Sequence, residues 1–452
     1  MIEKIKELNV DISTEDLRKI TYNIFCILIF LLPVVPELGN FGLITLKITL
    51  FNLITIITTI VLILLNIKEI KKFKFTFYDG LNITYLLLVI LSSIFSKFSF
   101  KDCFLGTNGR GEGILTIFSY LMTFTIIYKG FKYFNKKLLL VGIIGSLVLS
   151  LYGIIQANAP AGVKLIINTA NVPGVAEGTM GNQNFFSSYL CIFLPMMCYY
   201  FLETKDYKSI IAVVLLFTAF VFAKTLGGYI VFAVMYVIIA VFCFVFSKKK
   251  THTIIKFGAM TILLVAIFFS ITYEKGDKYV EEVKEVKKEA TNLVKKDEGF
   301  GTGRMGIWHL TLMAINNNKL LGVGPDSLAE EFRADTYKQN GYTNMLDKYR
   351  VDKAHCELLQ IAATTGIPSM IVYLMLIATI GIRLLIIVFR KHIKDRENKD
   401  NVFETMVLVS IGSYVAQALG NISVAQVAPI FWLMLGIAAA ITLKKDNEKT
   451  EK

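Results

Sequence analysis

The residues whose types and spacing point most clearly to chemistry lie in one polar stretch, residues 299–366. This stretch reads GFGTGRMGIWHL, then LLGVGPDSLAEEF, then VDKAHCELLQIAATTG. Arg304 follows a Gly-Thr-Gly turn, where a guanidinium can present its fork to two phosphate oxygens. His355 is a side chain that accepts a proton near neutral pH. The stretch therefore points to phosphate binding and proton transfer, although an arginine on lipid headgroups and a plain surface histidine remain alternatives.

Three short glycine-rich segments carry further candidate residues. The segment GVGPD contains Gly324 and Asp326 and is typical of a tight turn before a helix. It lacks the Lys-Ser/Thr of a P-loop, so nucleotide binding is not supported. GTNGRGEG and GNQN place Arg110 and Asn182 just before hydrophobic segments, where helix N-termini favour anions. Helix capping explains these last two segments equally well.

Neither a metal site nor a bound cofactor is expected. No second histidine or cysteine stands at ligand spacing from His355. Four of the six cysteines lie in apolar segments, and nothing in the sequence pairs the other two, Cys103 and Cys356. We therefore expect free thiols at all six positions: Cys26, Cys103, Cys191, Cys198, Cys243 and Cys356.

The rest of the chain is membrane-like in composition. Its 452 residues are 54% hydrophobic and 18% charged, against about 45–50% and about 25% in soluble domains. Apolar runs of about 18 residues or more predict spanning helices. We expect an all-α polytopic membrane protein with about twelve transmembrane helices, at residues 19–36, 44–66, 80–96, 113–129, 138–156, 185–202, 208–223, 228–246, 255–273, 367–389, 402–420 and 424–443.

The distribution of basic residues predicts the topology. Every second loop is rich in Lys and Arg, as in KEIKKFK after the second span and RKHIKDRENK after the tenth. By the positive-inside rule these loops are cytoplasmic, which places both termini inside and residues 273–365 outside. The net charge of +13 is thus a topology signal, and nucleic acid is not an expected partner. Residues 1–17 are polar without a small-residue cleavage site, so we expect the first span to be retained.

The outward loop has helical patterns of its own. Residues 275–297 have the pattern of a charged, solvated helix, and residues 325–332 can begin another with Asp326 near its start. Residues 303–315 predict an amphipathic helix with an apolar stripe of Met305, Trp308, Leu312 and Ile315. We therefore divide the chain into an N-terminal transmembrane bundle (1–272), an extracytoplasmic loop (273–366), and C-terminal transmembrane helices with a cytoplasmic tail (367–452).

The order of the motifs resembles the O-antigen ligase and polymerase superfamily of bacterial envelope glycosyltransferases. The matching segments, over roughly residues 100–385, are GTNGRGEG, GTMGNQNFFSSYL, TGRMGIW, GVGPDSL and DKAHCELLQIAATTGIPS. The resemblance implies a GT-C-like enzyme of the cytoplasmic membrane. Such an enzyme takes glycan from an undecaprenyl-diphosphate carrier on the outer face and transfers it to a hydroxyl on a lipid, a glycan or a protein. Membrane lipids are its remaining partners.

The resemblance also assigns roles to individual residues. It maps the family's loop arginine onto Arg304 and its essential histidine onto His355. A second family arginine falls at Leu226, so Lys224 is left to supply charge there, without a bidentate contact. The family's asparagine after the histidine is Cys356 here.

Elementary chemistry agrees with these roles. Diphosphate is a good leaving group that needs charge stabilisation, which Arg304, Arg110 and Lys224 can provide without a metal. A sugar hydroxyl has a high pKa and needs a base, for which His355 is the best candidate, with Glu357 or Asp326 behind it.

Three other classes of protein compete with this reading. A transporter or flippase also has about twelve spans, but it usually holds charges or broken helices at mid-membrane. A peptidoglycan polymerase of the shape-and-division class fits the loop motifs less well. A structural or sensory membrane protein does not require so many polar residues to be concentrated in one outer loop.

Overall fold

The computed structural model describes residues 13–36, 43–72, 74–107, 111–159, 174–247, 250–273, 303–333, 351–394 and 399–450. Helices, and no strands, form its regular structure within these ranges. Twelve of the helices coincide with the twelve predicted spans: α2 (Thr14–Leu31), α3 (Leu43–Asn66), α4 (Phe77–Ile94), α6 (Ile114–Lys129), α7 (Leu138–Asn158), α8 (Gln183–Glu203), α9 (Ser209–Phe222), α10 (Leu226–Phe246), α11 (Lys250–Tyr273), α18 (Ile367–Lys394), α19 (Lys399–Ala418) and α20 (Ala428–Thr450).

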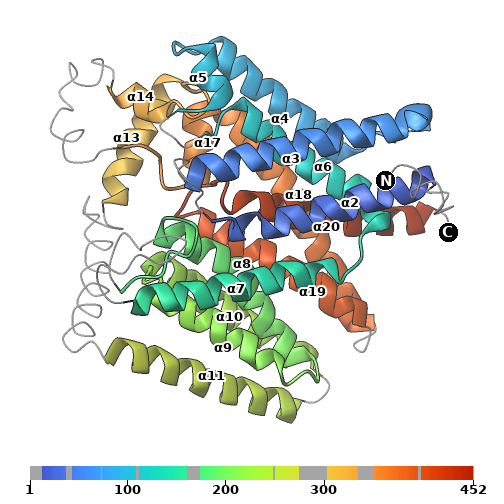
Figure 1. The fold of residues 1–452 in the computed structure, drawn as a ribbon, viewed down its shortest axis with the longest axis vertical. Coiled ribbons are helices and arrows are strands. Elements are labelled where there is room, and N and C mark those ends of the chain that lie inside the picture. Colours follow the sequence, from blue (N-terminus) through green and yellow to red (C-terminus); the bar gives the residue numbers. More distant parts are fainter. Residues whose placement is uncertain are drawn as a thin grey trace, which may run out of the picture.

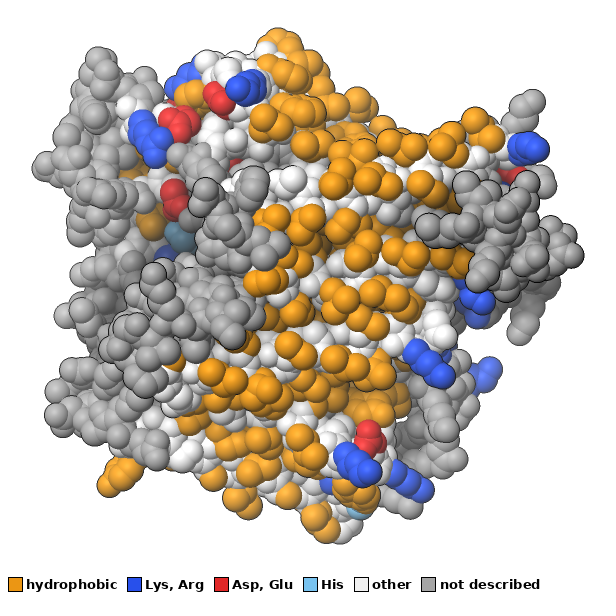
Figure 2. Space-filling view, in the orientation of Figure 1, with side chains coloured by type: hydrophobic (Ala, Val, Ile, Leu, Met, Phe, Trp, Pro, Cys, Tyr) orange, Lys and Arg blue, Asp and Glu red, His pale blue; other side chains and the backbone are white. Residues whose placement is uncertain are grey.

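These helices have the composition of a membrane domain. In the described part of the chain, eight helices are long and apolar enough to cross a bilayer, and α6, α9 and the first part of α20 are shorter apolar helices. Leu and Ile side chains are exposed along most of them, and hydrophobic side chains cover the middle of the face in Figure 2, with charged ones towards its two ends. The predicted all-α polytopic membrane fold is therefore confirmed.

Helix α8 forms the centre of the bundle. Its spanning window is 94% buried, whereas that of α11 is 17% buried. Helix α8 packs against α9, α10 and α19, while α20 packs against α6 and α18. The start of α8 is fixed by Lys47 of α3, which is fully buried. Its Nζ atom donates hydrogen bonds to the carbonyl of Pro33 at 2.9 Å and to the carbonyl of Thr179 at 2.6 Å. Thr179 lies in the turn before α8.

The polar segment after α11 forms a separate small core at one end of the bundle. It contains α13 (Arg304–Asn317), α14 (Leu328–Arg333) and α17 (Glu357–Thr365), and α5 (Phe100–Leu105) lies beside them. Figure 1 shows these helices at the end opposite to where α2 begins and α20 ends. This arrangement agrees with the expectation that both termini lie on one side and the polar loop on the other. The predicted helix at 275–297 lies outside the described residues.

The predicted apolar stripe of α13 was right at Ile315 and wrong at Leu312. Leu312 is 53% exposed, and the buried face consists of Gly306, Leu310, Thr311, Ala314 and Ile315. The reason is that α13 packs on α17 within the small outer core, where Leu310 and Ala314 contact the alanines of α17. Residues four apart share a helix face, so the set from Gly306 through Leu310 to Ala314 defines this contact.

All six cysteines are free and buried, as predicted from the sequence.

Candidate functional site

The guanidinium group of Arg304 lies where two segments of the membrane domain meet. Arg304 is the first residue of α13, and Gly303 before it has φ +90°, a left-handed conformation that favours glycine. The Nη1 atom of Arg304 is 3.6 Å from the position that a Cβ atom would take on Gly227, and 3.6 Å from that on Gly420. Gly227 lies in the first turn of α10, and Gly420 lies between α19 and α20. These distances place the guanidinium group against both segments.

The start of α8 belongs to the same cluster. Asn421, which follows the glycine beside Arg304, donates a hydrogen bond to the carbonyl of Asn184 at 3.2 Å. The hydroxyl of Thr225, just before α10, donates to that of Ser187 at 2.7 Å. The N-termini of α8 and α10 therefore lie close to the guanidinium, and the free N–H groups of helix N-termini attract anions. The side chain of Asn182 caps α8 by accepting from the Asn184 N–H at 2.8 Å.

Three sequence-predicted site residues have an unusual backbone. Among the described residues, the non-glycine positions with positive φ are Lys224 (50°), Asp326 (58°) and His355 (49°). Such conformations cost about 1–3 kcal/mol each and occur preferentially at functional sites. The strain thus falls on positions that were selected from the sequence for their chemistry.

His355 lies one residue before the N-cap of α17, and its side chain is 30% exposed. Its Nε2 atom faces the carboxylate of Asp352, with 3.8 Å between Nε2 and Oδ1. The carboxylates expected behind His355 were Glu357 and Asp326, but the structure gives both of them other partners. Closeness in sequence does not by itself place the carboxylate of Glu357 beside the ring of His355, because the backbone turns at His355.

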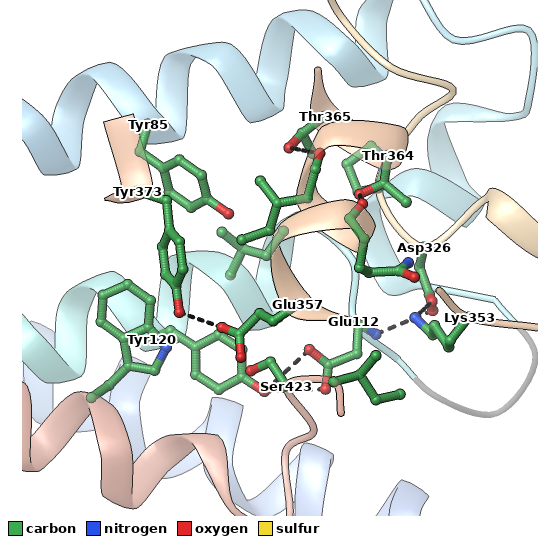
Figure 3. A pocket seen from close by; sticks show the side chains of 16 residues that line it. Tyr85, Glu112, Tyr120, Asp326, Lys353, Glu357, Thr364, Thr365, Tyr373 and Ser423 are labelled. Carbon is green, nitrogen blue, oxygen red and sulfur yellow. Dashed lines mark hydrogen bonds and ion pairs between the residues drawn. The ribbon is translucent and has the colours of Figure 1, made fainter. Parts of the chain in front are cut away.

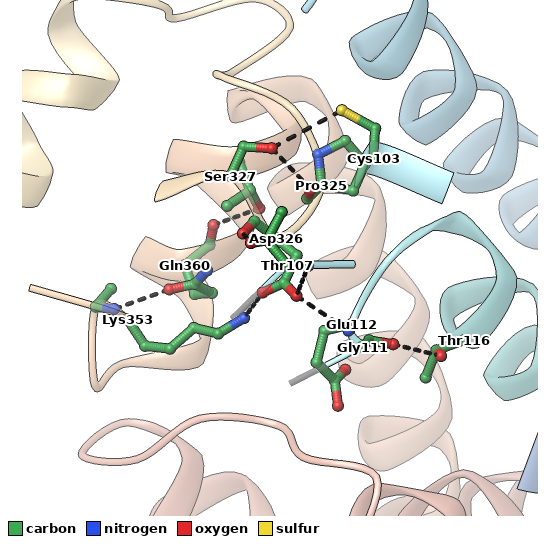
Figure 4. A network of polar contacts seen from close by, with 12 residues as sticks. Cys103, Thr107, Gly111, Glu112, Thr116, Pro325, Asp326, Ser327, Lys353 and Gln360 are labelled. Carbon is green, nitrogen blue, oxygen red and sulfur yellow. Dashed lines mark hydrogen bonds and ion pairs between the residues drawn. The ribbon is translucent and has the colours of Figure 1, made fainter. Parts of the chain in front are cut away.

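Asp326 is the centre of a buried network that joins three of the motifs (Figure 4). It forms an ion pair with Lys353, and both side chains are at most 5% exposed. Its Oδ2 atom accepts hydrogen bonds from the backbone N–H groups of Thr107 at 2.8 Å and Glu112 at 3.2 Å. Arg110 itself lies outside the described residues. The network nevertheless fixes the chain on both sides of Arg110 against the segment that carries His355.

Lys353 is therefore an important residue that the sequence reasoning missed. The signal in the sequence was the position of Lys353 in DKAHCE, two residues before His355. A lysine near a buried turn needs a counter-charge.

We expect Lys353→Met to destabilise the protein strongly. The substitution leaves Asp326 buried without its cation, and breaking one side of a buried pair typically costs about 3–5 kcal/mol. The double variant Lys353→Met/Asp326→Asn should recover much of the loss. Thermal unfolding in detergent measures both. Lys132→Met is the control, because Lys132 pairs with Glu15 at 2.9 Å in a bridge whose side chains are 64% and 53% exposed, and it should cost much less. Equal losses for the two lysines would contradict this role.

Gly324 has a packing role in the structure. Its φ is +118°, and an added Cβ atom would lie 2.5 Å from Oγ of Ser96 and 3.0 Å from Sγ of Cys103. The glycine therefore allows the turn before Asp326 to approach the end of α4. Ser96 also donates to the carbonyl of Val323 at 2.7 Å, which holds this turn in place. Contact of Gly324 with substrate stays a prediction.

Glu357 points into a cavity of about 70 Å³ between α17, α6 and α18 (Figure 3). It accepts a short hydrogen bond from the hydroxyl of Tyr373, and desolvation raises the pKa of Glu357 to about 7. On the opposite wall, Glu112 accepts from the hydroxyl of Tyr120 at 3.1 Å. Removal from water raises the pKa of Glu112 to about 8, although the charge of Lys353 opposes this shift. Both carboxyl groups therefore hold a proton more readily than an exposed glutamate does.

No group of three or more His, Cys, Asp or Glu side chains is arranged to hold a metal ion within the described ranges. Metal independence of the reaction stays a prediction.

Comparison with known proteins gives a family match for part of the chain. A family model described as O-antigen ligase matches residues 211–374. The match runs from α9 into α18 and includes Lys224, Arg304, Asp326, His355 and Glu357, whereas the segments around Arg110 and Asn182 precede it. A search of curated proteins gives no match. Over residues 211–374 the chain matches the O-antigen ligase family, which supports the predicted relationship to the O-antigen ligase and polymerase superfamily, and its long apolar helices support a multi-pass membrane protein.

Proposed function

We propose that this protein transfers a glycan from an undecaprenyl-diphosphate-linked donor to an acceptor hydroxyl at the outer face of the bacterial cytoplasmic membrane. The observation that carries the proposal is the position of Arg304. Its guanidinium lies beside Gly227 and Gly420, next to the N-termini of α8 and α10. A planar cation and two helix N-termini form a suitable site for a diphosphate at the membrane surface.

The reaction needs one bond to form and one to break. The acceptor oxygen attacks the anomeric carbon of the donor sugar, and the bond between that carbon and the diphosphate oxygen breaks. Negative charge develops on the leaving diphosphate, where Arg304 stabilises it, with Lys224 and Arg110 as further cations. The acceptor hydroxyl loses its proton to the His355 ring, which is partly exposed and therefore accessible to a substrate.

The small outer core gives these residues a rigid support. Val323 and Gly324 donate backbone hydrogen bonds to the carbonyls of Ala363 and Thr364, at 2.9 and 2.8 Å. Ser92 of α4 donates to the carbonyl of Thr364 at 2.9 Å. The segment that carries His355 is thus tied to the membrane domain, and a covered site favours transfer to a sugar over hydrolysis by water.

We expect the purified protein to transfer glycan from a lipid-diphosphate donor at an undiminished rate in excess EDTA. The physical reason is that Arg304 and the helix N-termini supply the charge stabilisation that a metal ion supplies in other transferases. Product formation is measured by gel shift or mass spectrometry with and without EDTA. A rate that falls on chelation and returns with Mg²⁺ or Mn²⁺ would contradict metal independence, and no transfer under any condition would contradict the proposed reaction.

Labelling in intact cells tests the orientation. Leu320 is 73% exposed in the outer core, and Lys205 is exposed in the loop between α8 and α9. We expect Leu320→Cys to react with a membrane-impermeant thiol reagent in intact cells, and Lys205→Cys to react only after permeabilisation. The six native cysteines are buried, so they provide a low background. The reverse pattern would invert the topology and exclude a site on the outer face.

A further inference from the structure

The cavity beside Glu357 has the chemistry of a binding site that the proposed transfer step does not use. Its polar lining includes Glu112, Glu357, Gln360 and Ser423, and its aromatic lining includes Tyr85 and Trp432. Figure 3 shows the carboxyl groups of Glu112 and Glu357 directed towards the same space from opposite walls. Hydroxyl-bearing ligands are commonly bound by such a mixture of hydrogen-bonding groups and aromatic faces.

The carboxyl group of Glu357 belongs to the cavity wall and has partners on the adjoining helices. Glu357 is 4% exposed, and its Oε1 atom accepts from Tyr373. The hydroxyl of Tyr414 is a second hydrogen-bonding group beside this carboxyl. The cavity lined by Glu357 and Glu112 has a volume of about 70 Å³. The space is large enough for a few water molecules or a small hydroxylated group, but it is too small for a whole sugar ring.

We propose that this cavity binds the hydroxymethyl group of a neutral acceptor sugar. The identification of the ligand as part of the acceptor rests on the proposed transfer function. Arg304 and His355 do not line the cavity, but neighbouring chain positions do: Lys353 and Glu357 lie on either side of His355 in the sequence, and Ile422 and Ser423 follow Gly420, which lies beside Arg304. A sugar held here by its hydroxymethyl group would present its ring hydroxyls towards that region.

The charge balance of the cavity favours a neutral ligand. Among the described residues that line the cavity, Lys353 is the one cation, and it is already paired with Asp326. The raised pKa values of Glu112 and Glu357 favour their protonated forms, which donate as well as accept hydrogen bonds. Besides Lys353 and Asp326, which act on Glu112, the titratable groups that face the two carboxyls are tyrosines of the surrounding helices: Tyr85, Tyr120, Tyr373 and Tyr414.

The tryptophan in the cavity wall allows a binding test that needs neither donor nor transfer. The chain has two tryptophans, Trp308 and Trp432, and Trp432 lines the cavity. In a Trp308→Phe background, fluorescence therefore reports on Trp432 alone. The probes are methyl hexosides of glucose, galactose and mannose, and for each the matched pentoside that lacks the hydroxymethyl group and the matched uronide that carries a carboxylate in its place.

We expect at least one methyl hexoside to change the fluorescence saturably, and its pentoside and uronide to bind at least about tenfold more weakly, the effect of one lost buried hydrogen bond. Glu357→Leu should weaken hexoside binding to a similar degree, whereas Glu357→Gln should retain it. Glu404→Gln, a buried glutamate paired with Lys391 at the other end of the bundle, is the matched control and should change nothing.

The outcomes separate this inference from the proposed function. No saturable signal with any hexoside, or equal binding of pentosides or uronides, would overturn the hydroxymethyl site even if transfer activity is found. Unchanged binding in Glu357→Leu would overturn it as well. Selective hexoside binding in a protein that transfers no glycan would support the cavity as a sugar site and contradict the assigned reaction.

Discussion

Replacing Arg304 by lysine is expected to lower glycan transfer at least about 100-fold, while the folded protein stays in the membrane. The substitution retains the positive charge but removes the planar fork that contacts two phosphate oxygens at once. Losing one preorganised donor to a developing negative charge typically costs about 10²–10³ in rate. Arg304→Ala should lose at least as much. Initial rates with a lipid-diphosphate donor, normalised to the amount of detergent-purified protein, measure the effect.

The structure provides a matched control for this substitution. Arg333 also lies in the outer segment, but it is 65% exposed and pairs with Glu330 three residues away, so Arg333→Lys should leave transfer unchanged. A crowding variant gives a second arm: Gly227→Val adds a branched side chain whose Cβ atom lies 3.6 Å from Nη1 of Arg304, and it should reduce transfer without changing any charge. Full activity in Arg304→Lys would show that a point charge is sufficient, and full activity in Arg304→Ala would remove Arg304 from the site.

The fold was predictable because its main signals are local. A spanning helix needs about 20 apolar residues wherever it packs, so hydropathy alone located all twelve helices within a few residues. What the sequence did not provide is the burial of each face. The stripe on α13 was assigned from helical periodicity alone, and the helix packs on α17, about fifty residues later in the chain. Such a contact depends on tertiary packing, which periodicity cannot specify.

The candidate site was predictable in its residue types and less so in its connections. The positions of Arg304 and His355 were selected from turn chemistry and from the resemblance, and both lie in the outer segment at one end of the bundle. Asp326 was expected to assist a base, but its carboxylate holds Lys353 and two backbone N–H groups. Glu357 was expected beside His355, and it accepts from Tyr373 of α18. These partners come from segments far apart in sequence, and a single sequence gives no signal for such pairs.

These contacts give the residues of the outer segment two different roles. The buried pair of Asp326 and Lys353 holds the backbone in place, and residues with a left-handed backbone conformation set the direction of the other side chains. A left-handed residue turns its side chain away from the direction that a regular helix start would give it. His355, with φ +49° just before α17, is the residue for which this matters most, because its ring has to reach a substrate.

Replacing His355 by alanine is expected to lower transfer by about 10²–10⁴-fold, the usual contribution of a general base. His355→Gln separates two roles, because glutamine forms hydrogen bonds but does not accept a proton near neutral pH. If His355 takes the proton of the acceptor hydroxyl, the glutamine variant should be nearly as inactive as the alanine variant. Substantial activity in the glutamine variant would instead assign His355 to positioning the acceptor or the diphosphate.

Two control variants distinguish a chemical role of His355 from a simple loss of structure. His309→Ala removes the other histidine of the outer segment, which is exposed on α13, and should leave transfer intact. His355→Gly relieves the left-handed backbone, because glycine adopts positive φ readily. It should therefore be at least as stable as His355→Ala in thermal unfolding and equally inactive. If the alanine variant retains wild-type transfer, His355 is not the proton acceptor. If activity is lost in the alanine variant and returns in the glycine variant, the loss lies in the backbone, and the proton acceptor has to be sought elsewhere at the site.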